Sequence, residues 1–409
     1  MLSRILAPCF TLACFCGPAG VGETPPKAPA PKKPFFDARK HQTDYAGPGR
    51  DQPEPADVSE ALIGYFGPSD TADPEGGDMW LAAQWAVEEA NRQGGYRGKP
   101  FRLVPGWSEN PWGTGVRRVV RMAYAEKVWA IVGGIDGPST HLAEQVAAKA
   151  RLPLLSPAST DKTVNLANVP WMFSLVPGDH LQAPVLVAAI QERLGDRPFV
   201  LVSGKDHDGH CLAVELGKCF AARDMVPSYH FECDRAAGDV VELVTRIVES
   251  QPGAVVLVAG ADQSARLVAG LRRQGFTGPV FGGPTMGRRR FREIAGGAAE
   301  GVVFPLLYSP QATSAEFSFS KAFEDRFGHS PDYAAAHTYD AFRLLVAAMR
   351  KAGLNRARIR DAVAELSPWS GVTGSVAWDP LGSNTRPVSL GTIQDGQIVP
   401  VAEGRSDEG

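Results

Sequence analysis

The chain has 409 residues, of which 44% are hydrophobic and 21% are charged, and its formal net charge is -3. This length is sufficient for two domains with large buried cores, and the composition is ordinary for a soluble globular protein. The small net charge gives no indication of a nucleic-acid-binding surface.

Residues 1–16 have the layout of a secretory signal peptide. Arg4 precedes an apolar run from Ile5 to Phe15, and small residues follow this run. No later apolar run approaches the roughly 18 residues of a membrane span. We therefore expect an exported protein, periplasmic or otherwise extracytoplasmic. Cys14 follows the residues TLA, so it is either the lipid-modified residue of a bacterial lipoprotein or a residue near an ordinary cleavage point.

Residues 17–57 are expected to be a disordered linker, because they are rich in Pro, Lys and Asp and have no apolar period. A linker of this length suits a tethered domain. The chain is expected to end in a flexible tail, residues 403–409.

From Ala61 onward, short apolar runs alternate with segments of helical period. The runs LIGYF, FRLV, WAIVGG and LPLLS are too continuously apolar for half-exposed strands, so we expect a parallel sheet covered on both faces. After MFSLVPGDH the rhythm restarts with PFVLVSG, SYHFE, AVVLVAG, PVFGG and GVVF. Two such series in tandem predict two doubly wound parallel-sheet α/β lobes. Three helical segments and a set of short strands then close the chain.

The order and spacing of several segments resemble those of the periplasmic leucine/isoleucine/valine-binding protein family, the type I solute-binding proteins of ABC importers. The resemblance is carried by IGYFGPSDTADPEGGDMWLAAQWAVEEANRQGGYRGKPFRLV, AIVGGIDGPSTHLAEQVAAKARLPLLSPASTDK, YDAF and GVTGSVAWDPLG, and it runs from about Ala61 to about Pro400. It implies two lobes joined by three crossover strands, with the ligand enclosed between them. We expect residues 58–178 and 305–368 in lobe 1, and residues 179–304 and 369–402 in lobe 2.

The ligand site is expected at the carboxyl ends of the strands, where connections diverge in open α/β sheets. The long loop from Gly67 to Gly77 follows the first strand, so it should form part of the cleft wall. GGIDGPST and SPASTDK each follow a strand as well, and backbone N–H groups with hydroxyls at a helix start suit a carboxylate. Helix capping is the alternative role of these hydroxyls. The candidate ligand-binding residues are Trp107, Asp136, Gly137, Ser139, Thr140, Ser159, Thr160, Asp208, Asp262 and Thr285.

Departures from the family pattern argue against a leucine-like ligand. Gly137 stands where amino-acid-binding members of the family place a carboxylate-gripping serine, and Asp208 stands where they present a tyrosine. A further aromatic is missing near Ala261 and Asp262. No carboxylate lies around Pro284 or Thr285 to pair with a ligand ammonium. Because an unpaired charge in a closed cleft is costly, we expect a small polar ligand that is not leucine-like.

Trp107 and Trp112 follow the second strand, where they would either stack on a ligand or pack the rim of lobe 1. The acidic residues Asp136, Asp208 and Asp262 would offer acceptors for hydroxyl groups or cations, or would serve as turn and cap residues. The basic run GRRRFRE, Arg288 to Glu293, reads as solvated surface in preference to an anion site.

The segment KDHDGHC brings together four metal-ligand types, His207, Asp208, His210 and Cys211. A metal site needs ligands that converge, usually from separate segments of the chain, whereas these four residues all lie in one segment. We therefore expect no bound metal and no cofactor. Only Cys211, Cys219 and Cys233 lie beyond the signal segment. One disulfide among them would leave one thiol over.

No nucleophile elbow, phosphate loop, dinucleotide-binding fingerprint or HExxH motif occurs, so we expect no catalysis. The sequence therefore predicts a monomeric solute-binding protein that delivers its ligand to an ABC transporter permease by hinge closure. The alternative is a sensing module that presents ligand occupancy to a receptor or kinase.

Overall fold

The structure, a computed structural model, describes residues 45, 47–167, 169–234, 240–310 and 313–401. The predicted signal peptide with Cys14, most of the predicted linker and the predicted tail lie outside these residues. In the described part of the chain, no helix combines the length and the apolar character that a membrane span requires.

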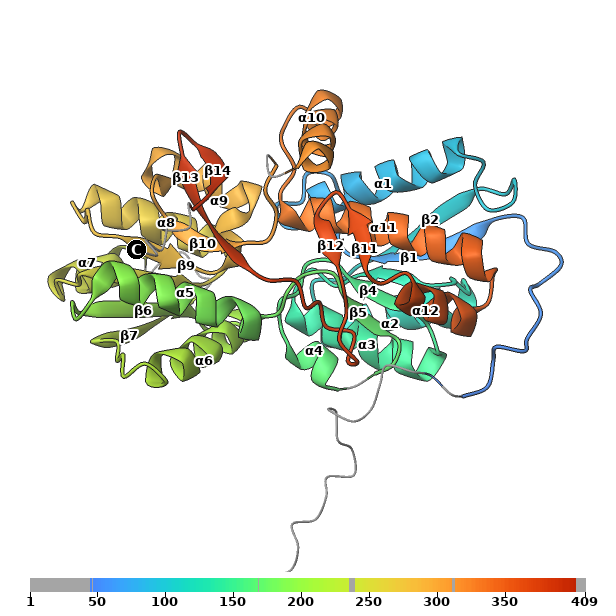
Figure 1. Ribbon diagram of the computed structural model, residues 1–409, viewed down its shortest axis with the longest axis horizontal. Helices are drawn as coiled ribbons and strands as arrows, with labels where there is room; N and C mark the ends of the chain where they lie inside the picture. The colour runs from blue at the N-terminus through green and yellow to red at the C-terminus, as the bar shows by residue number, and fades with distance from the viewer. Residues whose placement is uncertain (1–44, 46, 168, 235–239, 311–312, 402–409) are drawn as a thin grey trace, which may run out of the picture. The chain divides into compact units, whose positions relative to one another are not determined.

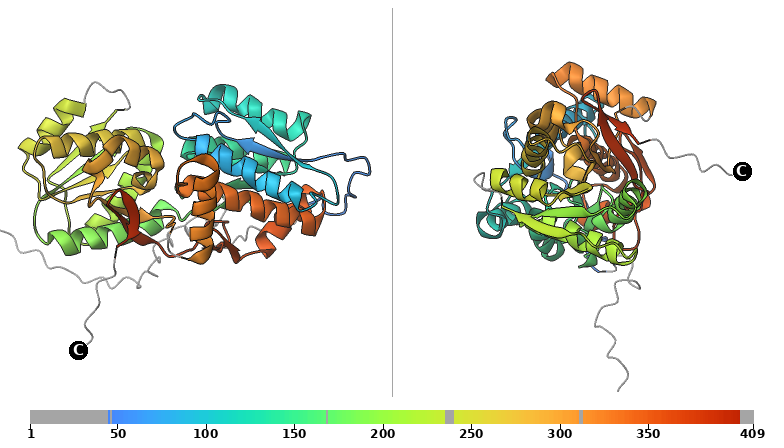
Figure 2. Two further views of the ribbon diagram at one scale, coloured as in Figure 1. Left: turned by 90° about the horizontal axis from the view of Figure 1, so that it is seen from above. Right: turned by 90° about the vertical axis from the view of Figure 1, so that its left-hand side faces the viewer.

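Lobe 1 is built on a five-stranded parallel sheet of order β2-β1-β3-β4-β5 (Figure 1). Its strands are β1 (Ala61–Phe66), β2 (Phe101–Gly106), β3 (Ile131–Gly133), β4 (Leu154–Ser156) and β5 (Met172–Ser174). Its helices are α1 (Gly77–Arg92), η1 (Pro111–Gly115), α2 (Val116–Val120), η2 (Arg121–Ala125), α3 (Gly137–Ala150), α4 (Thr163–Leu166), α10 (Ser314–Phe327), α11 (Tyr333–Ala352) and α12 (Arg356–Glu365). Helix α11 lies along α1, as the view from above also shows (Figure 2).

Lobe 2 contains a seven-stranded sheet of order β14-β13-β10-β9-β8-β6-β7. Its strands are β6 (Phe199–Gly204), β7 (Tyr229–Cys233), β8 (Ala254–Val258), β9 (Val280–Gly282), β10 (Val303–Leu306), β13 (Ser389–Gln394) and β14 (Gln397–Pro400). Its helices are α5 (Asp179–Leu194), α6 (His207–Ala221), α7 (Val240–Glu249), α8 (Ala261–Arg273), η4 (Pro284–Gly287), α9 (Arg289–Ala295) and η5 (Gly296–Ala299). Strands β6 to β10 run parallel, whereas β13 pairs antiparallel with β10 and β14.

The parallel parts of the two sheets share one order, in which the first strand of each lobe lies between the second and the third. This order confirms the two predicted doubly wound sheets. The apolar runs explain the strands, because every residue of β6 and of β8 is buried and both faces of these strands are covered by helices. The spacing in α1 also predicts its inner face correctly, since Met79, Ala82, Ala83 and Ala86 are at most 2% exposed.

Three segments connect the lobes, and their described residues are 175–178, 307–310 with 313, and 377–388. They are hydrogen-bonded to one another. Asn384 Nδ2 donates to the carbonyl of Leu175 at 2.6 Å, and Arg386 Nη2 donates to the carbonyl of Leu307 at 2.6 Å. Tying the crossovers together in this way restricts relative motion of the lobes to bending and twisting about this region.

The hairpin of β11 (Trp369–Gly371) and β12 (Gly374–Val376) lies on the lobe 1 side of the crossovers, although the sequence places residues from 369 onward in lobe 2. The buried carboxylate of Asp340 in α11 fixes it. This carboxylate accepts hydrogen bonds from the backbone N–H groups of Val372 at 2.9 Å and Thr373 at 2.8 Å. A strand pattern alone does not reveal such a side-chain anchor.

Residues 47–57 also differ from the sequence-based expectation, which includes them in the disordered linker. Arg50 forms an ion pair with Asp361 of α12 at 2.6 Å, and Asn355 Nδ2 donates to the carbonyls of Gly49 and Gln52 at 2.7 and 3.0 Å. These contacts are polar, so an apolar period could not have predicted them. The chain from 47 to 57 is therefore docked on lobe 1 without regular secondary structure.

Candidate functional site

A cleft lies between the lobes at the carboxyl ends of the strands of both sheets. Its walls follow five of these ends, namely β3, β4, β6, β8 and β9, and the loop after β1 adds Glu75. The space between these walls is about 810 Å³ when the open solvent at its mouth is included. The lining residues are Glu75, Ile135, Asp136, Ala158, Thr160, Asp206, Asp208, Gly209, Leu212, Val258, Ala259, Gly260, Ala261, Gly283, Pro284, Thr285, Arg288 and Tyr333.

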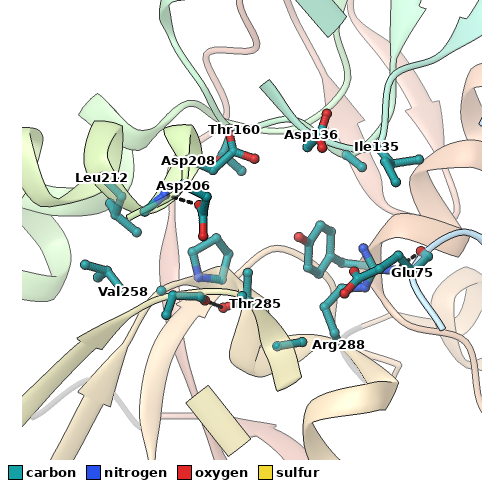
Figure 3. Close-up of a pocket in the computed structure, with 18 residues that line it drawn as sticks. Glu75, Ile135, Asp136, Thr160, Asp206, Asp208, Leu212, Val258, Thr285 and Arg288 are labelled. Carbon is teal, nitrogen blue, oxygen red and sulfur yellow. Dashed lines mark hydrogen bonds between the residues drawn. The ribbon is translucent and has the colours of Figure 1, made fainter. Parts of the chain in front are cut away.

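Carboxylates dominate the charged groups of this lining. Glu75, Asp136, Asp206 and Asp208 stand against a single arginine, Arg288, and Figure 3 shows them around the open centre of the cleft. Apolar side chains such as Ile135, Leu212 and Val258 fill part of the remaining wall. The cleft can therefore accept hydrogen bonds from a ligand at several points, but it offers few free cationic partners.

The start of α3 organises the lobe 1 wall. Asp136 is the N-cap of this helix, and its side chain accepts from the backbone N–H of Ser139 at 2.8 Å. The hydroxyl of Thr140 donates to the carbonyl of Asp136 at 2.7 Å. Ser139 and Thr140 are completely buried. Both hydroxyls therefore serve the helix start, which was the alternative reading of these two candidates, and only Asp136 lines the cleft.

Gly137 and Asp208 meet across the cleft. The backbone N–H of Gly137, the first residue of α3, donates to Asp208 Oδ1 at 3.0 Å. Burial and then the nearby charge of Asp136 raise the pKa of Asp208 to about 7. A Cβ atom on residue 137 would lie 2.4 Å from Asp208 Oδ1, so a larger residue at this position cannot coexist with this contact unless Asp208 moves. The missing family serine and the unexpected aspartate are therefore parts of one arrangement.

Thr160 follows β4 and lines the cleft. Its carbonyl accepts a hydrogen bond from the backbone N–H of Asp179, the first residue of α5, at 2.8 Å, and its side chain lies near the carboxyl group of Asp179. Burial raises the pKa of Asp179 well above its usual value, and the side chain of Thr160 offsets this only in part. The neighbouring candidate Ser159 is buried outside the cleft lining, and its Oγ has no hydrogen-bond partner among the described residues.

The remaining candidates are divided between the cleft and the surface of each lobe. Thr285 lines the cleft and donates to the carbonyl of Ala259 at 2.7 Å. Asp262 lies outside the lining and forms an ion pair with Arg290 at 2.8 Å. Trp107 also lies outside it and packs on Phe66 with a ring separation of 5.3 Å, which is the rim-packing alternative.

Two arginines from lobe 2 contact lobe 1 beside the cleft, and we call these the arginine contacts. Arg288 is 6% exposed, its Nε lies 2.7 Å from Asp332 Oδ2, and its Nη2 donates to the carbonyl of Glu75. Arg289 Nε lies 2.7 Å from Asp78 Oδ2 at the start of α1. Burial would raise the pKa of Asp332, but the charge of Arg288 lowers it. The reading of this basic run as solvated surface is therefore wrong for Arg288, because its partners are distant in sequence.

A second set of polar contacts joins the lobes on another side, and we call these the histidine contacts. His207 Nε2, at the start of α6, lies 2.7 Å from Asp161 Oδ2 in lobe 1. His141 Nε2 lies 3.2 Å from the same oxygen, and its Nδ1 lies 3.3 Å from Glu144 Oε2. Hydrogen bonds to Asp161 and Glu144 raise the pKa of His141 to about 9. Burial would raise the pKa of Asp161, but hydrogen bonds from both histidines hold it well below its usual range.

The three cysteines beyond the signal segment are free thiols in the structure. Burial raises the pKa of Cys211 to about 12 and that of Cys233 to about 11, so both are protonated near neutral pH. The disulfide that the sequence allows among them is not formed.

Several lining residues were not selected from the sequence. Asp206 caps α6 through the N–H of Gly209, and the rule of strand ends could have found it, because it lies two residues after β6. Glu75 lies in the loop from Gly67 to Gly77, which was expected to form part of the cleft wall. Arg288 begins the basic run that was expected to be solvated surface, and Tyr333 reaches the cleft through the packing of α11. No local motif marks Tyr333.

Two α/β lobes that face each other across a cleft, joined by three crossovers, define the type I periplasmic-binding-protein fold. The sequence matches the periplasmic binding protein family over residues 63–397, and the chain belongs to this family. The family implies a location outside the cytoplasm, and branched-chain amino-acid-binding proteins are among the relatives of the chain.

An amino acid binding protein from Pseudomonas aeruginosa is 25% identical over 333 residues, which cover 80% of this chain and 87% of the relative. The structure of LivJ from Streptococcus pneumoniae in complex with isoleucine is similar with a TM-score of 0.74 at 22% identity, covering 84% of this chain and 100% of LivJ. A solute-binding protein from R. palustris in complex with benzoate is similar with a TM-score of 0.75 at 17% identity, covering 84% of this chain and 95% of that protein. These structures show the fold, and their ligands belong to different chemical classes. The relatives are substrate-binding proteins.

Proposed function

We propose that the protein captures a small polar ligand in the interlobe cleft and delivers it to the permease of an ABC importer, without catalysis. The observation that carries the proposal is the cleft itself, whose lining comes from strand ends of both lobes. Family membership adds the transport context. We expect the binding unit to be a monomer, since each monomer contains both walls of the cleft.

Hinge closure would couple binding to delivery. A ligand that touches both walls gains its full set of contacts only when the lobes are together, so it shifts an open–closed equilibrium toward the closed state. The arginine and histidine contacts and the bond between Gly137 and Asp208 would form in the same step, because each has partners in both lobes. A permease would then recognise the closed pair of lobes.

The lining favours a ligand with an amine or several hydroxyl groups over a leucine-type zwitterion. Four carboxyl side chains offer acceptors, whereas Arg288 is already paired with Asp332. The N–H of Gly137, which would remain for a ligand carboxylate, is taken by Asp208. A free carboxylate on the ligand would therefore enter an acid-rich cleft without a partner, which is unfavourable.

Mass spectrometry of small molecules released from the gently denatured full chain would identify the ligand, and calorimetric titration would then measure its affinity. We expect Asp136→Asn to weaken binding of an amine or polyol about ten- to a hundredfold, because a hydrogen bond to a charged group contributes about 1.5–3 kcal/mol. Asparagine keeps the helix cap, so the fold should persist. Asp262→Asn is the matched control, since Asp262 lies outside the cleft. Equal affinities of the two variants would contradict this site.

The identity of the membrane protein that binds the ligand-loaded chain distinguishes transport from sensing. Affinity capture with ligand-saturated protein from membranes of the source organism should recover an ABC permease. Recovery of a histidine-kinase ectodomain in place of a permease would support the sensing alternative and overturn the delivery step.

A further inference from the structure

We propose that His141, Asp161 and His207 form a binding site for a divalent transition-metal ion that bridges the two lobes, with Cys211 as a fourth ligand. The site lies among the histidine contacts. It does not depend on the identity of the ligand in the cleft.

The geometry suits one ion. One potential ligand atom from each of His141, Asp161 and His207 lies within 4.8 Å of the other two. Asp161 Oδ2 lies 3.2 Å from His141 Nε2 and 2.7 Å from His207 Nε2. Ligands about 2.0–2.2 Å from a tetrahedral zinc ion are about 3.3–3.6 Å apart, so shifts of about 1 Å place these atoms around one ion.

The ligands come from three segments and from both lobes. His141 is on α3, Asp161 follows β4, and both belong to lobe 1, whereas His207 and Cys211 are on α6 of lobe 2. His207 and Cys211 are four residues apart and so share one face of the helix, with Cys211 Sγ 3.5 Å from His207 Nε2. Cys211 Sγ is not among the atoms that lie within 4.8 Å of one another, so its side chain has to rotate toward the ion to become a ligand. The sequence cluster KDHDGHC lacks convergence by itself, and the fold supplies the missing partners from lobe 1.

The surroundings resemble those of a built metal site. Glu144 Oε2 lies 3.3 Å from His141 Nδ1, so a carboxylate stands behind a ligating imidazole, which fixes the ring and raises its basicity. A cavity borders the cluster and is lined in part by Asp161, Cys211 and Asp179. Asp179 is 2% exposed, and its Oδ1 has no hydrogen-bond partner among the described residues. The cavity gives an ion an entry path with acceptor oxygens along it.

The ligand types select the class of ion. Two imidazoles, one carboxylate and one thiol suit zinc and neighbouring transition metals, whereas magnesium and calcium prefer shells of oxygen atoms. Asp208 and His210 take no part, because Asp208 faces Gly137 and His210 is an exposed residue outside the cluster. An ion held by ligands of both lobes would act as a clasp that stabilises the closed arrangement.

Calorimetric titration of zinc into the full, chelator-treated chain tests the site. The wild type should bind zinc, and His141→Ala in lobe 1 and His207→Ala in lobe 2 should each weaken binding at least tenfold. Loss of a residue that hydrogen-bonds a metal ligand typically lowers the metal affinity about 10- to 100-fold. Because Glu144 contacts the imidazole of His141 in this way, Glu144→Gln should weaken zinc binding within that range. His230→Ala is the matched control, because His230 lies outside both the cluster and the cavity, and it should leave the affinity unchanged. Circular dichroism and melting of each variant verify the fold.

Cobalt serves as a spectroscopic probe of the fourth ligand. The cobalt-loaded wild type should show a thiolate charge-transfer band, and Cys211→Ser should abolish it. A band that persists in Cys211→Ser arises from another cysteine and overturns the role of Cys211. The proposal as a whole is overturned if the wild type does not bind zinc. It is also overturned if His207→Ala keeps the wild-type affinity, since the site then does not bridge the lobes, or if His141→Ala keeps it, since His141 is then not a ligand.

Discussion

The arginine contacts predict that Arg288→Met destabilises the closed arrangement of the lobes. Methionine preserves much of the length and the packing of the stem but leaves Asp332, which is 3% exposed, without its cationic partner. Removing one member of a buried ion pair costs about 3–5 kcal/mol, because the remaining charge is buried and uncompensated. The protein can escape this cost by opening, which returns Asp332 toward water. If opening of the lobes costs less free energy than the buried unpaired charge, the observed loss of stability equals only the free energy of opening.

Two measurements on the full chain distinguish opening of the lobes from loss of stability in the closed arrangement. Small-angle X-ray scattering should show a larger radius of gyration for Arg288→Met than for the wild type if the lobes separate. Thermal melting should show a lower transition if they remain closed. Arg290→Met is the matched control, since Arg290 pairs with Asp262 within lobe 2 and both side chains are more than one third exposed. Such a pair contributes at most about 1 kcal/mol.

The double variant Arg288→Met with Asp332→Asn refines the test. Removing the orphaned charge should recover a large part of the loss, and asparagine retains the N-cap of α11. The reasoning fails if Arg288→Met matches Arg290→Met in both the scattering and the melting experiments. The interlobe pair would then make no net contribution in solution.

Three further outcomes are expected. Thr160→Val should lower the free energy of unfolding by about 1–3 kcal/mol in chemical denaturation, because it removes a polar hydroxyl group that stabilises the buried carboxyl group of Asp179. Unchanged stability would contradict this role. Burial lowers the pKa of His337 to about 3, so between about pH 3 and pH 6.5 this histidine is protonated only in the unfolded chain. On acidification to pH 5, the free energy of unfolding of the wild type should therefore fall by about 2 kcal/mol more than that of His337→Leu. Parallel profiles of stability against pH for the two proteins would contradict this expectation. Leucine, isoleucine and valine at millimolar concentration should leave the melting temperature almost unchanged, although a ligand at a hundredfold excess over its Kd stabilises by about 2.7 kcal/mol, and a clear upward shift with leucine would refute this expectation.

Most of the fold could be predicted from the sequence because the signals are local and repeated. Continuous apolar runs gave the parallel strands, and helical spacing gave the inner faces of helices such as α1. The docking of residues 47–57 and the place of the β11–β12 hairpin could not be predicted in this way. Both depend on a few polar contacts between residues that are distant in sequence, such as Arg50 with Asp361 and Asp340 with Val372.

The candidate site was predictable to the extent that it follows strand ends. Asp136, Thr160, Asp208 and Thr285 line the cleft, as the topological rule implies. Polar residues at a helix start satisfy that rule equally well whether they cap the helix or face the cleft, so Ser139 and Thr140 were selected with them. Their burial, which separates the two roles, is a property of packing and leaves no mark in the local sequence.

The pairing of Gly137 with Asp208 connects the sequence departures to the proposed ligand. The resemblance to amino-acid-binding proteins implies that, in those proteins, a serine at the start of the helix corresponding to α3 holds the carboxylate of the ligand. Here the carboxyl group of Asp208, supplied by the opposite lobe, accepts from the first N–H of that helix at 3.0 Å. The positive end of the helix dipole favours an anion at this position, so the protein's own side chain occupies the place that a ligand carboxylate would take. Replacing the serine by glycine removes the Cβ that would lie 2.4 Å from Asp208 Oδ1. The two departures are therefore one physical change, and they favour a ligand that brings hydrogen-bond donors to the cleft in place of a carboxylate.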